Sequence, residues 1–436
     1  MKDRIENLKI AERGNRQYFR RIRVRDYLPG QAIYNLGDYP EQISARPTEY
    51  DKQLIGKLAK SGVKLIQLHE DWNDAVRLYG GDKFHAVDPE GMKAFVELCH
   101  EHEIKVIAYV SSGYFQETDP DFREEYTRSK EVLAMNYFKY RKGHHGNALW
   151  REYIIPKTLN VMEEYGFDGI YNDWGYDGYL DEDCTVLPEY DGEVEDLLSI
   201  LYSEVKKRGG IYKLHCDRNN KPPCIDKVYD YLWIGEWVET LETGVGKYYD
   251  LYVVPCQDRH RSDAISLEAY MARTIPFLQF PLLKTGRPVR GENTDLPGVT
   301  YYGGDEQTFY KAVHDYRIKN PEGPQVYSLW SSIPDDIHEM EVWNRYFQLY
   351  QPMVTENSLV YLELRECDDI CSDIPQYVYA SMFVNEKRYL VVSNLGQETY
   401  RLMLKGTWME RMNGYLSGEF EIAPGQMCFL EEVNEG

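Results

Sequence analysis

The strongest constraint on the fold is a regular alternation of short β-rich runs with amphipathic helical stretches between residues 31 and 283. This alternation is typical of βαβ units, in which helices join parallel strands. The β-rich runs begin at Ala32, Val63, Lys105, Gly169, Ile211, Tyr231, Leu251 and Phe277. Apolar residues at three- and four-residue spacing predict helices at 49–60, 89–102, 149–165, 194–207 and 264–274.

Eight strands joined in this way predict a (β/α)8 TIM barrel. An open doubly wound sheet is the alternative, but no glycine-rich dinucleotide fingerprint follows the first run. From about residue 358, runs of alternating polarity separated by turn residues predict an antiparallel β-sandwich. We therefore expect an α/β chain with an N-terminal extension at 1–30, a barrel at 31–355 and a C-terminal all-β domain at 356–436.

Composition narrows the class of partner. A formal charge of −22 disfavours binding to nucleic acid and to anionic membranes. The first residues lack the apolar run of a signal peptide, and no window reaches the ~18 apolar residues of a membrane span. We expect a cytoplasmic protein without a cofactor that binds a neutral or cationic ligand. Exposed aromatic residues of the tail leave a homo-oligomeric contact open as an alternative.

In a barrel the active site lies at the C-terminal ends of the strands. The sharpest candidate is Asp173, which directly follows the strand-like segment Gly169–Asn172, and strand alternation predicts that it faces the substrate together with Tyr171. The alternative role of Asp173 is to cap the next loop. Further polar and aromatic residues close the other strands and are predicted to bind substrate: His69, Asp71, Trp72, Tyr114, Trp174, His215, Asp217, Trp237 and Asp258.

Glycoside hydrolysis needs two carboxyl groups, one acting as nucleophile or base and one as proton donor. Glu236 provides the second carboxyl group at the end of the sixth run. Two neighbouring tryptophans would raise its pKa and keep it protonated as a general acid. The alternative is a surface carboxylate paired with Lys or Arg. The richness in aromatic residues, with 38 Tyr and 8 Trp, suits sugar binding, because these rings stack on sugar C–H groups.

The segment Gly166–Asp173 resembles the strand-4 nucleophile region of retaining α-glycosidases, in the clan of α-galactosidases and family 31 α-glucosidases. Trp233–Trp237 is similar to the strand-6 acid/base segment of that clan, although the clan has Asp where this chain has Glu236. The resemblance implies that Asp173 is the nucleophile and Glu236 the acid/base of a double displacement on an α-linked hexoside. The chain also lacks the N-terminal β-sandwich common in family 31, which points to a distant family.

Three alternatives stay open on the sequence. The barrel could bind an oligosaccharide without catalysis, or it could be an inverting glycosidase that uses Asp217 or Asp258. A lyase or metal-dependent hydrolase would use His and Asp residues, but the pair His144 and His145 has no third ligand nearby in the sequence. The eight cysteines show no zinc spacing, so we expect no metal site.

Overall fold

The computed structural model describes residues 3–36, 44–69, 72–73, 84–86, 88–116, 119–135, 138–173, 187–216, 228–235, 252–256, 265–287 and 337–433. The chain divides into two compact units. The barrel unit contains residues 31–234 and 282–336, and the sheet unit contains residues 1–30, 235–281 and 337–436. Each unit is therefore built from segments that are far apart in the sequence.

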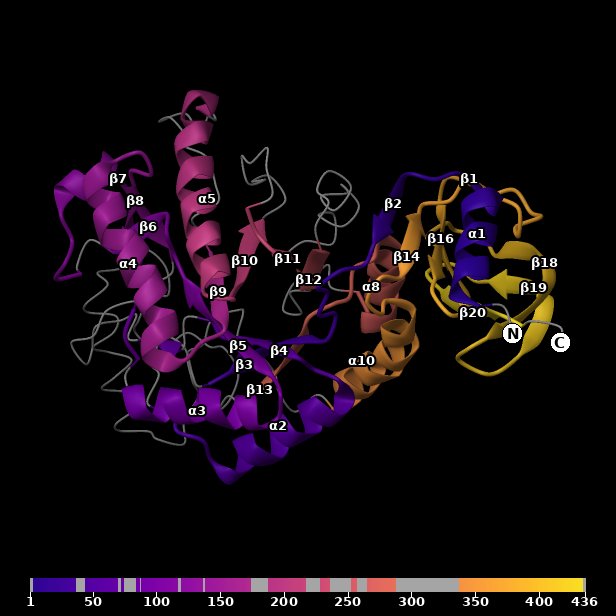
Figure 1. The fold of residues 1–436 in the computed structure, drawn as a ribbon, viewed down its shortest axis with the longest axis horizontal. Helices are drawn as coiled ribbons and strands as arrows, with labels where there is room; N and C mark the ends of the chain where they lie inside the picture. Colours follow the sequence, from indigo (N-terminus) through magenta and orange to yellow (C-terminus); the bar gives the residue numbers. More distant parts are fainter. Residues whose placement is uncertain are drawn as a thin grey trace, which may run out of the picture. The chain divides into compact units, whose positions relative to one another are not determined.

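An eight-stranded sheet forms the predicted barrel (Figure 1). Its strands follow one another in the order β12-β11-β10-β9-β5-β4-β3-β13, and the pairs β13–β3, β3–β4, β4–β5, β5–β9, β9–β10 and β10–β11 are parallel. The ring is nearly closed, and the fold class expected from the sequence is confirmed. The bounds are β3 Gln31–Asn35, β4 Leu65–Gln67, β5 Lys105–Val110, β9 Gly169–Asn172, β10 Ile211–Cys216, β11 Tyr231–Gly235, β12 Tyr252–Cys256 and β13 Leu283–Gly286.

Helices follow the strands as the sequence predicts. They are α2 Glu49–Ser61, α3 Pro89–Glu101, α4 Ala148–Tyr165 and α5 Asp191–Lys207, with the short helix η3 Pro188–Tyr190 before α5. Thr48 and Asp51 form a capping box that starts α2, and Gly62, in the left-handed conformation with φ of 93°, ends it. In Figure 1 α2 and α3 lie side by side along the barrel unit.

The eighth strand differs from the sequence prediction. The run beginning at Phe277 was expected to be a strand, but Ile275–Phe277 form the 3-10 helix η4. Pro276 fits the first turn of this helix, and Leu278 then adopts a left-handed conformation with φ of 61°. The strand β13 starts six residues later, at Leu283, after Pro281. An apolar run containing proline was therefore a poor strand signal.

Arg287 ties the end of β13 to α2. Its guanidinium donates to both carboxylate oxygens of the fully buried Asp51, at 3.0 Å each, and to the carbonyl oxygens of Leu36 and Ser44. The hydroxyl of Tyr34 donates to Asp51 at 2.6 Å. Burial alone would raise the pKa of Asp51, but the hydrogen bonds from Arg287, Tyr34 and Thr48 hold that pKa below its ordinary value.

An antiparallel insertion follows the third barrel strand. It contains β6 Tyr114–Gln116, the 3-10 helix η2 Glu124–Tyr126, β7 Thr127–Met135 and β8 Phe138–Gly143. The strands pair in the order β6-β8-β7. Phe115, Tyr126, Trp150 and Tyr153 pack edge to face or stacked on one another, which joins the insertion to α4.

The sheet unit contains a seven-stranded sheet in the order β19-β18-β20-β17-β16-β14-β2, with β14–β2 and the pairs among β16 to β20 antiparallel. Residues from strands far apart in this order, including Tyr361 of β14 and Phe420 of β19, share one apolar core. The C-terminal all-β domain expected from the sequence is confirmed. Its strands form one continuous antiparallel sheet around a core. Its bounds are β2 Arg20–Arg23, β14 Leu359–Leu362, β16 Val378–Val384, β17 Arg388–Asn394, β18 Tyr400–Glu410, β19 Leu416–Ile422 and β20 Met427–Glu432.

The N-terminal residues belong to this unit. The helix α1 Arg4–Gly14 places Ala11 in the sheet core, and β1 Asn15–Gln17 pairs with β15 Glu366–Cys367. Among its described residues, the unit also contains α8 Leu267–Thr274, α10 Ile337–Tyr350 and the 3-10 helices η4 and η5 Gln351–Met353. The hydroxyls of Ser381 and Ser393 donate to carbonyl oxygens of Pro276 and Ala272, which fixes η4 and α8 to the sheet.

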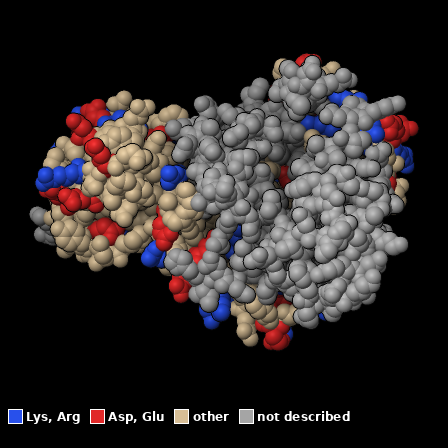
Figure 2. All heavy atoms as spheres, turned by 180° about the vertical axis from the view of Figure 1, so that it is seen from behind, with Lys and Arg blue, Asp and Glu red and all other residues tan. Residues whose placement is uncertain are grey.

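The described surface carries charged side chains of both signs. On the face shown in Figure 2, Lys and Arg side chains lie beside Asp and Glu side chains on the described surface. Several exposed residues of the described chain form ion pairs, such as Arg16 with Asp368 and Lys52 with Glu49. No helix in the described part of the chain is long and apolar enough to span a membrane.

Candidate active site

The backbone around Asp173 is fixed on both sides. The amide of Asp173 donates to the carbonyl of Val110 at 2.8 Å, which extends the pairing of β9 with β5. Asn172, fully buried, donates to the hydroxyls of Ser112 and Tyr212 and accepts from the amide of Ser112 at 3.0 Å. Asn172 therefore clamps β9 to Ser112, which follows β5, and to Tyr212 of β10, and the next residue leaves the strand in a defined direction.

Gly169 starts β9 where a side chain does not fit. A Cβ atom at this position would lie 1.9 Å from the carbonyl oxygen of Ile211 on β10. The preceding Asp168 accepts from the amide of Val106 at 2.8 Å and contacts His100 Nε2 at 2.8 Å. The Asp168–Gly169 turn thus sets the start of the strand that ends in Asp173.

Asp173 and His215 form a buried pair at the C-terminal ends of adjacent strands. The Nδ1 of His215 lies 2.5 Å from Oδ1 of Asp173, and the two residues are 5% and 8% exposed. A carboxylate can only accept a hydrogen bond, so the proton of this bond lies on His215 Nδ1. The sequence predicted both residues as members of the site, and the structure brings them into direct contact.

Aromatic rings line the barrel interior around this pair. Tyr171 lies 5.8 Å from both Tyr109 and Trp233 between ring centroids, and Trp233 packs edge to face on His215 at 4.3 Å. The His69 ring lies 5.7 Å from Tyr171. Parallel register explains the grouping, because Tyr109, Tyr171 and Lys213 are paired neighbours in one row and His215 and Trp233 in the next.

Two lysines lie on the same interior face. Lys213 is fully buried and donates from Nζ to Oε1 of Gln31 at 2.9 Å, and Lys284 is 7% exposed. Removal of water from His69 lowers its pKa to about 3; the charges of Lys284 and Lys213 act in the same direction, and that of Asp173 opposes them. His69 is therefore a neutral imidazole near neutral pH. Its Nε2 lies 3.2 Å from the amide nitrogen of Gln67.

The sequence missed several of these neighbours as site residues. Tyr109, Trp233, Lys213 and Gln31 were not among the predicted substrate ligands. A signal for Lys213 was present, because Lys213 and His215 are two residues apart on one strand and so face the same side. The contact of Lys213 with Gln31 was not readable, since 182 residues separate the two.

One predicted ligand, Trp72, has a packing role. Trp72 is fully buried: its indole N–H donates to the carbonyl of Tyr109 at 2.8 Å, and its ring packs edge to face on Tyr165 and Phe167. These contacts explain Trp72 as a packing residue. Tyr114 lies in β6 of the insertion, paired with Lys142. The other predicted site residues lie outside the described residues: Asp71, Trp174, Asp217, Glu236, Trp237 and Asp258.

Within the described ranges, no group of three or more His, Cys, Asp or Glu side chains could hold a metal ion. The two histidines considered for this role, His144 and His145, have different contacts. His144 lies 3.4 Å from Glu193 of α5, whereas His145 is fully buried and its carbonyl accepts from Arg151.

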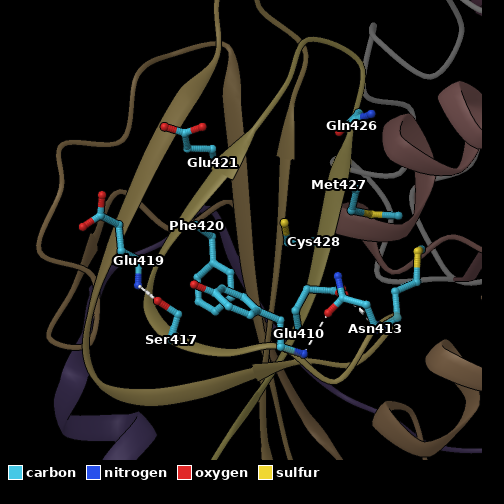
Figure 3. A pocket seen from close by; sticks show the side chains of 11 residues that line it. Glu410, Asn413, Ser417, Glu419, Phe420, Glu421, Gln426, Met427 and Cys428 are labelled. Atoms are coloured by element: carbon cyan, nitrogen blue, oxygen red, sulfur yellow. Dashed lines mark hydrogen bonds between the residues drawn. The ribbon is translucent and has the colours of Figure 1, made fainter.

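A pocket of about 640 Å³ opens in the sheet unit (Figure 3). Its polar side chains support the turn between β18 and β19. Glu410 accepts from the amides of Met412 and Asn413, and Ser417 accepts from the amide of Glu419. Glu419 also pairs with Arg401. The polar side chains around the pocket therefore stabilise a turn, and the candidate active site is the one in the barrel unit.

The fold is similar to that of solved TIM-barrel glycoside hydrolases. No model of a known protein family matches the sequence, and no curated protein is similar to it. A maltogenic α-amylase from Thermotoga neapolitana matches with a TM-score of 0.56 and 12% identity, over 93% of this chain and 99% of the other. An Anoxybacillus α-amylase matches with a TM-score of 0.56 and 11% identity, over 94% and 100%.

A family 36 α-galactosidase from Geobacillus stearothermophilus matches with a TM-score of 0.55 and 13% identity, over 98% of this chain and 59% of the other. At these identities the similarity is one of fold. The resemblance to the α-galactosidase clan, inferred from two short segments, is thus confirmed at the level of the fold. The α-amylases extend it to a second group of enzymes.

Proposed function

We propose that this chain is a retaining glycoside hydrolase that acts on an α-linked hexoside. The observation that carries the proposal is the buried Asp173, held by His215 at the C-terminal ends of two barrel strands and surrounded by aromatic rings. A barrel enzyme performs its chemistry at this end of the strands. The names of the structural neighbours, α-amylase and α-galactosidase, support an α-linked substrate.

In the proposed mechanism, an oxygen of Asp173 attacks the anomeric carbon while Glu236 donates a proton to the leaving glycosidic oxygen. A carbon–oxygen bond to Asp173 forms as the glycosidic bond breaks. Glu236, now a carboxylate, then takes a proton from water, which attacks the same carbon and releases Asp173. Each of the two displacements inverts the configuration at the anomeric carbon, so the product keeps the α configuration.

Other residues near Asp173 and the remaining predicted ligands would bind the sugar or support the site. Neutral His69 can donate one hydrogen bond to a sugar hydroxyl or accept one from it, without changing its charge near neutral pH. Tyr171 and Trp233 are fully buried and support the rings of His69 and His215. Asp71, Tyr114, Trp174, Asp217, Trp237 and Asp258 stay predicted substrate ligands.

The test is hydrolysis of a panel of aryl α- and β-hexosides by wild type, Asp173→Ala and Glu236→Ala. We expect Asp173→Ala to lower kcat by roughly 1,000-fold or more, which is about 4 kcal/mol of transition-state stabilisation. Added azide should restore turnover and give a glycosyl azide of inverted configuration. Glu236→Ala should retain activity best on substrates with acidic leaving groups.

Asp168→Ala is the matched control, because it removes a carboxylate from the opposite end of the same strand. It should reduce stability without creating azide-dependent turnover. Wild-type activity in Asp173→Ala would exclude Asp173 as nucleophile. A β-configured product from wild type would instead favour the inverting alternative with Asp217 or Asp258. Sugar binding without hydrolysis would favour the non-catalytic barrel.

A further inference from the structure

The contact between His215 and Asp173 identifies what His215 does. We propose that His215 is a positioning residue, which fixes the rotation of the Asp173 carboxylate through the Nδ1–Oδ1 hydrogen bond. This inference rests on the proposed function, in which Asp173 is the nucleophile. It replaces the role of sugar ligand that the sequence suggested for His215 with one exerted through Asp173.

The side chain of Asp173 needs such a partner. Its backbone is fixed by the bond to Val110 and by the Asn172 clamp, so the remaining freedom lies in the two side-chain torsions. The terminal torsion of an aspartate is broad and has no sharp preference of its own. A hydrogen bond of 2.5 Å to one oxygen removes this freedom and sets the direction of the other oxygen.

The imidazole of His215 is itself held in place. Its ring packs edge to face on Trp233 at 4.3 Å, and Tyr171 lies 6.4 Å away. Residues Lys213 to Cys216 pair in register with β11, so the backbone beneath the ring is part of the barrel sheet. Trp233 therefore supports His215, and His215 in turn supports Asp173, all within the barrel interior.

Two substitutions separate the position of the donor from its presence. In His215→Asn the side-chain amide nitrogen can occupy nearly the place of Nδ1, whereas in His215→Gln it lies nearer the place of Nε2. We expect His215→Ala and His215→Gln to lower kcat by about 10- to 100-fold, with KM changed less than about threefold. His215→Asn should recover most of the lost kcat. Equal losses in Asn and Gln variants with matched thermal unfolding midpoints would overturn the proposal.

A double substitution distinguishes positioning from sugar binding. In Asp173→Ala there is no carboxylate to position, so azide-dependent turnover should be the same in Asp173→Ala and in Asp173→Ala/His215→Gln. A further loss of tenfold or more in the double variant would mean that His215 contacts the sugar directly, which contradicts the inference. If the alanine variant does not fold, the Asn and Gln pair carries the same test.

A spectroscopic measurement tests the hydrogen bond without activity. Nitrogen-15 NMR of the His215 ring in wild type should report the Nδ1–H tautomer, and Asp173→Ala should shift the population toward Nε2–H. An unchanged tautomer would overturn the inference. If Asp173→Ala keeps full activity, the proposed function fails; if only the His215 variants behave as wild type, the positioning role alone fails.

Discussion

The charge of a side chain inside the barrel unit depends on how far it is removed from water and on which donors reach it. His69 and Asp51 illustrate the two cases. His69 loses water and stays neutral, with its pKa lowered to about 3. Asp51 is fully buried, but hydrogen bonds from Arg287, Tyr34 and Thr48 keep its charged form favoured. Stability should therefore depend on pH through both residues, in separate pH ranges.

His69 should make the protein less stable as the medium becomes acidic. The unfolded chain binds a proton at His69 below its ordinary pKa of 6.5, whereas the folded protein does so only near 3. The free energy of unfolding should therefore fall with pH below 6.5, by up to about 1.4 kcal/mol per pH unit. Urea unfolding at pH 7 and pH 5 measures the effect.

His69→Gln should weaken this pH dependence by up to about 2 kcal/mol between pH 6.5 and 5. His85→Gln, which changes an exposed histidine, is the control and should keep the wild-type slope. Identical slopes in His69→Gln and wild type would show that the folded protein accepts the proton at His69 as readily as the unfolded chain.

Neighbouring elements of the barrel unit are joined by a few polar residues at their ends. Asn172 links β5, β9 and β10, and Arg287 links the end of β13 to α2 and to the segment after β3. Each uses several hydrogen bonds from one buried or half-buried side chain. Removal of one partner would leave the others without hydrogen bonds in a site with little water, which is more costly than loss of one surface contact.

Asp51→Asn should destabilise the protein by about 3–5 kcal/mol at neutral pH, because Arg287 would lose its buried counter-charge. The folded pKa of Asp51 is below its ordinary value of 3.8, so its contribution is complete above pH 3.8 and is lost as the pH falls through the folded value. Denaturant unfolding should show a smaller difference between variant and wild type at pH 2 than at pH 7. Glu49→Gln, an exposed acid-to-amide change on the same helix, should cost less than about 1 kcal/mol.

Elements were easier to predict than contacts. The helices and seven of the eight barrel strands appear where local periodicity placed them, because each buries one face or both. The eighth strand was displaced because η4 and Pro281 interrupt an apolar run. The approach of His215 to Asp173 depends on strand register between β9 and β10, which the spacing within one strand does not specify.

At the scale of the whole molecule, the two compact units share one interleaved chain. The sheet unit takes residues from the N-terminal end, the region around α8 and the C-terminal end. The strand β2 pairs with β14 from Arg20–Leu362 to Arg23–Leu359, and Ala11 lies in the sheet core. The first thirty residues are thus part of the folded sheet unit.

Deletion of residues 1–23 should lower the thermal unfolding midpoint and expose β14 as a sheet edge. The loss should be roughly 2–4 °C for each kcal/mol removed, and the open edge should promote association. Differential scanning fluorimetry and light scattering measure the two effects. Arg21→Ala, which changes an exposed side chain of β2, is the control. An unchanged midpoint and a monodisperse deletion variant would contradict a structural role for this segment.

The pairing of β2 with β14 also has a consequence during synthesis on the ribosome. The two strands are roughly 340 positions apart, as the pair Arg20 and Leu362 shows. At about 5–20 residues per second, β2 leaves the ribosome tens of seconds before its partner exists. During this interval the Arg-rich strand must stay soluble by itself, and its four positions alternate between half-buried and exposed. Three arginines in four residues keep this strand soluble while its partner strand is still being synthesised.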